Sequence, residues 1–584
     1  MSRTCSLLTF RTHDGVDLTY RHWPAVCPPP DGWPARPALV LLHRGHEHSG
    51  RLQHLVDELD LDGVDAYAWD ARGHGLSPGA RGHSPSFGTS VRDVGTFVAH
   101  LRDAHGHTVE DVALVAQSVG AVLAAAWVHD EAPRLRGLVL AAPAFSVRLY
   151  VPFARPGLAL MRKLRGNFNV TSYVKAKFLT RDPDRIASYH SDPLVSRVIS
   201  VDILLGLFEA GTRLVDDAQA IRVPLQMLTS GADWVVHRKP QVRFFQRLGS
   251  ATKEHVVLED FLHDTLGERA RARAIGPVRA FLDRVFRAPL EDPDRGSDDR
   301  SGPSWEACER LATPLSALSP MGLLWGLQRF FLRTFLRASK GIDLGCRSGF
   351  DSGASLDHVY RNRAAGRLVL GRLVDRIYLE SPGWKGIRTR RQHLEELLRI
   401  ACGKVAEAGG SPRLLDPAAG HGRYLLDVLE QLPGEALLRD LLPANVEADR
   451  DRIRERGLQD RVRFEPGDAF DAEGLAAVAP RPNIAVVSGL FELFPSNAEV
   501  RRALAGLGAA VAPGGWLVYT NQPWHPQLEM IARLLRNHRG QPWVMRCRSQ
   551  REMDQLVGAA GFVKVAQRTD EAGIFSVSLA RREA

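Results

Sequence analysis

The sequence has few cysteines, no long apolar run and no segment that resembles a signal peptide. Its six cysteines are scattered and include no C-x-x-C pair (Cys5, Cys27, Cys308, Cys346, Cys402 and Cys547). This spacing suits reduced thiols better than a disulfide framework or a zinc site. Residues 1–15 hold no apolar segment of signal-peptide length, and no apolar run reaches the roughly eighteen residues that span a bilayer. We therefore expect a cytoplasmic protein.

The chain also lacks a strong charge imbalance for its size. Its 76 Lys and Arg residues against 67 Asp and Glu give a formal net charge of +9 over 584 residues. A solvated basic surface explains such an excess better than a basic groove for anionic lipid or nucleic acid does. We expect no nucleic-acid partner. A chain this long exceeds what one hydrophobic core supports, so two or more domains are expected.

The first half is organised around residues 112–128, VALVAQSVGAVLAAAWV, where a β-branched apolar run meets an Ala-rich segment at helical spacing. The pattern predicts a strand, a sharp turn at Ser118 and then a helix. A serine at such a turn is typical of the nucleophile elbow of α/β-hydrolases. Ala116 departs from that motif, because G-x-S-x-G has glycine there. An ordinary buried strand and helix would give a similar pattern.

Two further runs make the resemblance specific. HRGHEHSGR (residues 43–51), DARGHGLSPGARG (residues 70–82) and the serine turn follow one another in this order. Together they resemble the monoacylglycerol lipase and serine aminopeptidase branch of the α/β-hydrolases, over about residues 5–287. The resemblance implies a helical cap at about 144–215, with Leu179–Val195 as the return to the core.

The same family pattern implies a catalytic triad. Ser118 would be the nucleophile, His263 the base and Asp233 the residue that orients the imidazole, and both partners follow predicted strands in the expected order. The backbone N–H groups of Gly45 and Val119 would form the oxyanion hole.

Several side chains near this site stand apart from the triad. Relatives usually carry glycine where Arg44 and His46 stand, so Arg44 either narrows the hole or holds an acidic substrate group. We expect the neighbouring histidines to be structural or pocket-lining (His43, His46, His48 and His74).

Residues 288–304, APLEDPDRGSDDRSGPS, are polar and rich in Pro and Gly, which predicts a linker. After it, residues 321–338 place apolar side chains at helical spacing with arginines between them. We expect this helix to dock against the core of the second domain. Peripheral membrane contact is the alternative.

The second half reads as another α/β unit from residue 410. A predicted strand leads into DPAAGHGR (residues 416–423), and a helix follows. An acidic residue and alternate glycines at this place resemble the S-adenosylmethionine loop of class I methyltransferases, in which glycine lets the backbone approach the ligand. A dinucleotide-binding G-x-G-x-x-G loop is the rival, but Leu425 occupies its third glycine position.

Later strand ends fit the same resemblance. Asp440 would accept hydrogen bonds from the ribose, Asp468 would meet the adenine amino group, and Ser488 would lie beside the substrate. The full set of expected S-adenosyl-L-methionine contacts is Asp416, Ala418, Gly420, Gly422, Asp440, Asp468 and Ser488.

A companion region, residues 305–409, is predicted to be helical or irregular. Residues 349–353 and 383–388 in it, together with 522–527 further on, are aromatic, Gly-rich and polar runs that would build a pocket for the methyl acceptor.

We therefore predict an α/β protein of two domains, an α/β-hydrolase fold with a helical cap (1–287) followed by a Rossmann-like class I methyltransferase fold (410–584). The expected function is bifunctional: serine hydrolysis of a small lipid-type ester, and methyl transfer from S-adenosyl-L-methionine to an unknown acceptor. No metal is expected. One alternative is that the hydrolase half is a degenerate binding module. Another is methylation of RNA, although the sequence shows no RRM or KH signature.

Overall fold

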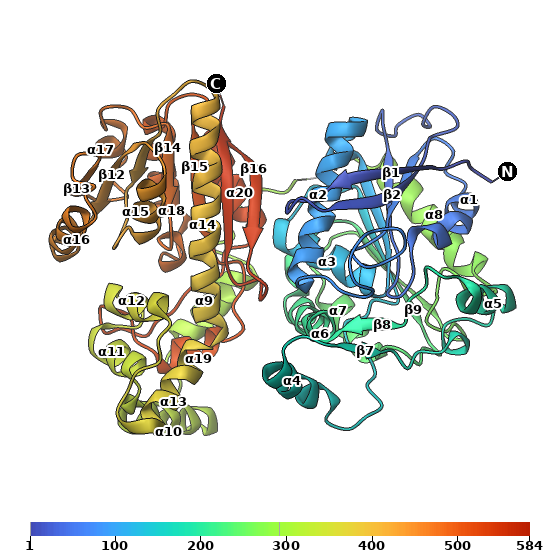
Figure 1. Ribbon diagram of the computed structural model, residues 1–584, viewed down its shortest axis with the longest axis horizontal. Coiled ribbons are helices and arrows are strands. Elements are labelled where there is room, and N and C mark those ends of the chain that lie inside the picture. The colour runs from blue at the N-terminus through green and yellow to red at the C-terminus, as the bar shows by residue number, and fades with distance from the viewer. Residues whose placement is uncertain (1, 291, 584) are drawn as a thin grey trace. The chain divides into compact units, whose positions relative to one another are not determined.

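A computed structural model describes residues 2–290 and 292–583, and the chain divides into two compact units, Met1–Asp292 and Pro293–Ala584 (Figure 1). The division falls inside the predicted linker, of which Glu291 lies outside the described residues. Residues 293–304 belong to the second unit. There the Asp299 carboxylate accepts a hydrogen bond from the N–H of Asn497 (2.7 Å), the first residue of a helix. A polar contact at the start of a helix thus holds this part of the predicted linker against the second unit.

The first unit is built on one eight-stranded sheet in the order β1-β2-β4-β3-β5-β6-β9-β10. β1 pairs antiparallel with β2, and β2 pairs antiparallel with β4. The six strands that follow β2 in this order, β4, β3, β5, β6, β9 and β10, are parallel to one another. The strands are β1 (Ser6–Arg11), β2 (Asp17–Trp23), β3 (Ala38–Leu42), β4 (Asp65–Trp69), β5 (Val112–Gln117), β6 (Gly137–Ala141), β9 (Leu225–Ser230) and β10 (Lys253–Leu258).

Helices cover both faces of this sheet, and an apolar cluster fills each side. The segment between β6 and β9 holds α4, α5, α6 and a small antiparallel pair, β7 (Asn169–Thr171) and β8 (Val198–Ser200). This insertion is where the cap is predicted. The helices are α1 (Gln53–Leu59), α2 (Phe87–His105), α3 (Val119–Glu131), α4 (Ala154–Arg165), α5 (Pro183–Ser191), α6 (Val201–Asp216), α7 (Arg238–Arg247) and α8 (Ala272–Arg287).

The second unit contains a seven-stranded sheet in the order β13-β12-β11-β14-β15-β17-β16. An antiparallel strand, β17, lies between β15 and β16. A dinucleotide-binding sheet runs 3-2-1-4-5-6 with no such insertion, so the topology argues against that rival. The strands are β11 (Arg413–Asp416), β12 (Glu435–Asp440), β13 (Val462–Pro466), β14 (Ile484–Val487), β15 (Trp516–Asn521), β16 (Phe562–Thr569) and β17 (Ser576–Arg582).

The companion region is helical throughout its main elements. Its longest helix, α14 (Pro382–Glu407), packs one end on the sheet through Leu394 and Leu397 and carries Trp384 and Ile387 into a separate apolar cluster. The other helices before the sheet are α9 (Pro303–Ala312), α10 (Pro320–Thr334), α11 (Lys340–Ser348), α12 (Gly353–Arg361) and α13 (Leu368–Leu379). Those that follow β11 are α15 (Arg423–Gln431), α16 (Pro443–Glu455), α17 (Ala472–Ala476), α18 (Asn497–Ala510), α19 (Leu528–Leu534) and α20 (Gln550–Ala559).

The expectation that residues 321–338 dock on the core is only partly met. Leu332 of α10 is buried and Trp325 packs beside it, whereas Leu323, Leu327 and Phe331 are each at least half exposed. One edge of the helix suffices for docking, so the remaining apolar side chains stay outside. Within the described residues, no helix combines the length and apolarity needed to cross a bilayer.

Candidate functional site

The predicted triad residues of the first unit lie in one chain of hydrogen bonds. Ser118 Oγ is 2.7 Å from Nε2 of His263, and Nδ1 of that histidine is 2.7 Å from Asp233 Oδ2. All three side chains are buried. Burial would raise the pKa of Asp233, but the charge and hydrogen bond of His263, with two backbone N–H donors, hold the pKa below its ordinary value. The carboxylate is therefore ionised and able to orient the imidazole.

The strand-to-helix turn places the buried Ser118 hydroxyl against the imidazole of His263. Ser118 has φ 56° and ψ −114°, a backbone conformation that L-residues rarely adopt, between β5 and α3. Gly120 permits the crossing of this helix over β3, since an added Cβ would lie 2.5 Å from the carbonyl oxygen of His43. Ala116 is buried in β5, where its methyl group fits.

The two predicted oxyanion-hole residues lie together. A Cβ on Gly45 would be 3.1 Å from a methyl group of Val119, and neither backbone N–H has an acceptor among the described residues. A small cavity of about 50 Å³ adjoins both, and apolar side chains such as Phe87 and Leu123 line part of it. This leaves room for part of a substrate beside the two free donors.

Arg44 lies in a buried network of charges. Its guanidinium donates to Glu47 (2.5 Å) and lies over the ring of Tyr189. Asp264, the residue after the triad histidine, accepts from Gln117 (3.0 Å) and from Arg185 of α5 (2.9 Å). These contacts fasten the histidine loop to the serine strand and to the insertion.

The sequence did not indicate the supporting roles of Asp264, Gln117 and Arg185. The one available signal was the match of Leu179–Val195, which contains Arg185, to the predicted return from the cap. The other histidines near the site lie outside the triad: His43 and His48, for example, bond to the carbonyl of Arg44 and to Asp192.

In the second unit, the predicted cofactor residues follow the carboxyl ends of four parallel strands. Ala418 and Gly420 lie in the loop after β11, Asp440 ends β12, and Asp468 and Ser488 follow β13 and β14. Carboxyl ends of parallel strands meet at one edge of a sheet, which is where ligands of such folds bind. The topology therefore brings the set to one edge.

Two aspartates at this edge shape the glycine loop. Asp416 is fully buried and accepts hydrogen bonds from Tyr424 Oη and from the N–H of Ala418. Asp440 accepts from the N–H of Gly420 (3.0 Å) and from that of Leu442 (2.8 Å). Asp440 is partly exposed and Asp468 exposed, so Asp440 can contribute to a ligand site while it anchors the loop.

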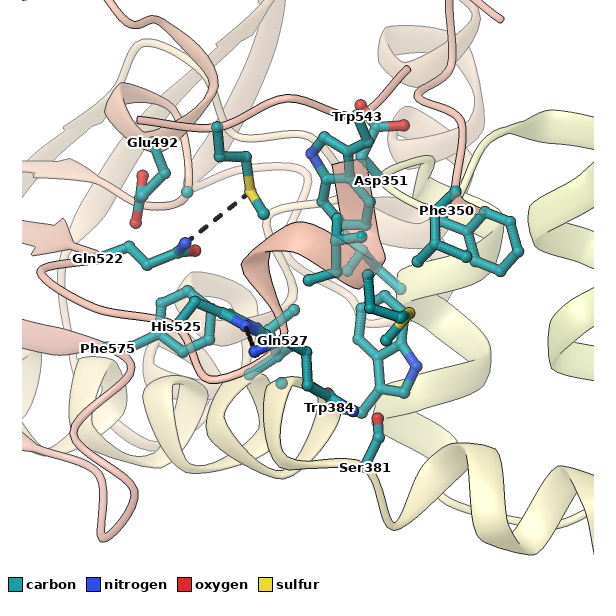
Figure 2. Close-up of a pocket in the computed structure, with 18 of the residues that line it drawn as sticks. Phe350, Asp351, Ser381, Trp384, Glu492, Gln522, His525, Gln527, Trp543 and Phe575 are labelled. Carbon is teal, nitrogen blue, oxygen red and sulfur yellow. Dashed lines mark hydrogen bonds between the residues drawn. The ribbon is translucent and has the colours of Figure 1, made fainter. Parts of the chain in front are cut away.

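The three runs predicted to form an acceptor pocket meet in one cavity of about 210 Å³ (Figure 2). Phe350, Trp384 and His525 come from the three runs, and the rest of the lining is mostly apolar. In Figure 2, Glu492, Gln522, His525 and Phe575 lie on one side, and Phe350 and Trp543 lie opposite. A largely apolar cavity with a few polar groups is the usual form of a small-molecule site.

The polar side of this cavity holds unpaired atoms. Glu492 and Arg390 are about 95% buried, and their nearest charged atoms are 3.6 Å apart. Oε1 of Glu492 accepts from Thr520 (2.8 Å), but Oε2 and the Nε of Arg390 have no partner among the described residues. Burial lowers the pKa of His525 to about 4, so this ring is neutral near pH 7. Such orphaned groups are suited to a polar ligand.

Family models of known proteins match both units of the chain. Residues 278–582, more than half of the chain, match the family model described as "Putative methyltransferase". The chain belongs to this methyltransferase family. Residues 34–270 match the model described as "Serine aminopeptidase, S33", so the protein joins an α/β-hydrolase fold to a methyltransferase fold.

Three similar proteins differ in how much of the chain they cover. "Uncharacterized protein YnbC" of Escherichia coli (strain K12) is 52% identical over 98% of both chains. "Phospholipase YtpA" of Bacillus subtilis (strain 168) is 26% identical over 42% of this chain and 95% of its own. "Monoacylglycerol lipase" of Mycolicibacterium smegmatis is 26% identical over 48% of this chain and 98% of its own.

The loop of the methyltransferase unit fits the sulfonium cofactor that the resemblance implies. Gly420 has φ 53°, and a Cβ built on it meets no protein atom within 4 Å. A ligand could therefore approach the backbone here. Gly422 differs, because a Cβ built on it would lie 3.0 Å from Leu438 Cδ1. Glycine at this position therefore allows close packing against Leu438 in addition to the positive φ.

This difference predicts distinct effects of the two glycines. Both Gly420→Ala and Gly422→Ala should lose roughly 1 kcal/mol of stability because φ is positive at each, and Gly422→Ala should lose more because its Cβ would crowd Leu438. Only Gly420→Ala should in addition weaken S-adenosylhomocysteine binding in proportion to steric overlap, by about tenfold or more. Calorimetric titration and thermal unfolding of both variants measure these effects. Equal affinities of Gly420→Ala and wild type would contradict the placement of the ligand.

Asp416 predicts a pH dependence of stability. Burial raises its pKa to about 7 despite the opposing hydrogen bonds, whereas an unfolded aspartate titrates near pH 4. Between these values the folded state binds the extra proton, so the free energy of unfolding should fall as pH rises, by up to about 4 kcal/mol. Asp416→Asn should flatten this slope between about pH 4 and pH 7 in unfolding measurements. An unchanged slope would show that another group is responsible.

Proposed function

We propose that the first unit hydrolyses a small ester of lipid type by serine catalysis. Ser118 Oγ attacks the ester carbonyl while His263 takes its proton, and Asp233 stabilises the imidazolium. The N–H groups of Gly45 and Val119 receive the oxyanion. The alcohol leaves with the proton from His263, and water then releases the acid by the same steps. The observation that carries this proposal is the continuous hydrogen-bond chain from Ser118 to Asp233.

The lipid type of the ester is supported by two observations. Relatives of the first unit include proteins named phospholipase and monoacylglycerol lipase. In the insertion between β6 and β9, α4 exposes Leu160 and Leu164, which suits an apolar substrate.

Labelling with a fluorophosphonate tests whether the unit is an enzyme or a degenerate binding module. The reagent forms a covalent bond only with an activated serine, so the label should appear on a single peptide that contains Ser118. A protein that stays unlabelled at a concentration that labels a known serine esterase would favour the binding module.

We propose further that the second unit transfers a methyl group to a small, largely apolar acceptor. Bound S-adenosyl-L-methionine would supply an electrophilic methyl group. The chain's own part is to hold this ligand at the strand ends, with Gly420 allowing close approach and Asp440 accepting from the ribose hydroxyls. Asp468 and Ser488 would complete the contacts at neighbouring strand ends.

The acceptor would lie in the 210 Å³ cavity. Its walls are mostly apolar, and the free Oε2 of Glu492 can accept a hydrogen bond or a proton from the acceptor's polar group. This unpaired buried oxygen is the observation that carries the proposal.

Methyl-labelled cofactor incubated with a lipid extract and with total RNA tests the acceptor class. Label should appear in the organic phase and should fall when Glu492 is replaced by Gln. Label in RNA would instead favour the nucleic-acid alternative.

A further inference from the structure

The helical part of the second unit presents apolar rows to solvent on two helices. Leu323, Leu327 and Phe331 recur every four residues along α10, and Val369, Leu373 and Ile377 do so along α13. Each of the six side chains is at least half exposed. Spacing of four residues places each row on one side of its helix. We call these two rows the α10–α13 face.

The two helices are neighbours in the fold. Both pack against the short 3₁₀ turn Leu336–Ala338, and Figure 1 shows them together at the lower end of the second unit. Exposed apolar side chains gathered in this way are uncommon on soluble monomers and mark an interaction site.

Arginines surround the face without compensating acids. Five of them, Arg333, Arg363, Arg367, Arg372 and Arg376, are exposed, and none forms an ion pair within the described part of the chain. α10 carries no acidic residue.

The acidic residues near the face are already engaged. Asp375 of α13 is buried and bonds to Ser339 and His358. Asp343 pairs with Arg337 and Arg347, and Glu380 with Lys385. The face therefore keeps its positive charge.

The combination of exposed apolar rows and unpaired arginines distinguishes between a second copy of the chain and a lipid surface as the partner. A second copy of the chain would bring the arginines of two faces together, which like-charge repulsion opposes. An anionic lipid surface satisfies both features, because its acyl chains receive the apolar rows and its phosphates receive the arginines. The same helices also lead to the cavity, which Leu332 of α10 and Tyr378 of α13 line.

We propose that the α10–α13 face docks on anionic phospholipid membranes, with the apolar rows in the interfacial region and the arginines at the phosphates. The docking stands independently of methyl transfer, and it would bring the two helices that line part of the cavity to the lipid that delivers an apolar acceptor.

Co-sedimentation of the full chain with vesicles tests the docking. One set of vesicles is pure phosphatidylcholine and another contains about 30 mol% phosphatidylglycerol. The protein should sediment with the anionic vesicles and mostly remain in solution with the neutral ones, and high salt should weaken the binding. Equal recovery with both compositions would overturn the role of the arginines.

Paired variants locate the binding surface. Leu373→Ser with Ile377→Ser should lower the apparent affinity for anionic vesicles by about tenfold or more, because apolar area is lost. Arg372→Gln with Arg376→Gln should lower it by about fivefold for each charge. Val563→Ser with Val565→Ser is the matched control, since both valines are half exposed on β16 of the same unit, and it should bind as wild type does. Loss in the control equal to that in the α13 pair would overturn the proposal.

A measurement without mutation guards against variants that fail to fold. Hydrogen–deuterium exchange of wild type with anionic vesicles should show slower exchange in residues 320–338 and 368–379 than without them. Unchanged exchange there, with the protein bound, would place the contact elsewhere. A stable dimer in light scattering that Leu373→Ser with Ile377→Ser disperses would show that a second copy occupies the face, and would also overturn lipid docking.

Discussion

Replacement of Ser118 by alanine is expected to abolish hydrolysis of a short-chain nitrophenyl ester, with a fall in kcat of about 10⁴–10⁶. The variant keeps the backbone turn but removes the oxygen that lies 2.7 Å from the His263 ring. Because the hydroxyl is small and buried, the fold should persist. Spectrophotometric release of nitrophenol measures the rate, and thermal unfolding verifies the fold.

His263→Ala should give a loss of similar size, and the double variant should lose little more, because triad members act as one unit. His255→Ala is a suitable control: this histidine lies on β10 and bonds to Thr229 rather than to the serine. Full activity of Ser118→Ala would remove the serine assignment. Additive losses in the double variant would mean that the two residues do not share one step.

Asp440→Ala is expected to weaken binding of S-adenosylhomocysteine about ten- to a hundredfold, which corresponds to roughly 1.5–3 kcal/mol. The substitution removes the carboxylate that we propose accepts hydrogen bonds from the ribose hydroxyls. It also removes the acceptor for the N–H of Gly420, a contact that sets the shape of the loop. Calorimetric titration of wild type and variant provides both affinities.

Two controls accompany this titration. Asp460→Ala removes an exposed carboxylate from the same unit and should leave the affinity unchanged. Ester hydrolysis by Asp440→Ala should equal that of wild type, because the two units have separate cores. No binding to wild type, or equal binding to Asp440→Ala, would refute the assignment of the cofactor site.

Local pattern was enough to predict the framework of both units. The strand, turn and helix predicted within residues 112–128 are β5 (Val112–Gln117), Ser118 and α3 (Val119–Glu131) in the structure. Apolar runs bounded by turn residues carry this information within a few positions. Family motifs with fixed order then supplied Ser118, Asp233 and His263, whose contacts the structure shows.

Other features depend on residues that are distant in the chain. The contacts of Asp264 with Gln117 and Arg185, and the burial of Asp416 against Tyr424, arise only when separate elements pack together. Nothing in the spacing of Gly420 and Gly422 tells which one faces open space and which one faces Leu438.

The helix α10 shows most clearly the difference between what local sequence pattern predicts and what tertiary contacts decide. Its sequence predicts an amphipathic helix because apolar side chains repeat at helical spacing. Which of those side chains are buried depends on what the rest of the chain brings against them, and here α19 and the turn at residues 336–338 cover little beyond Leu332 and Trp325. Periodicity follows from neighbours along the chain, whereas burial follows from neighbours in space.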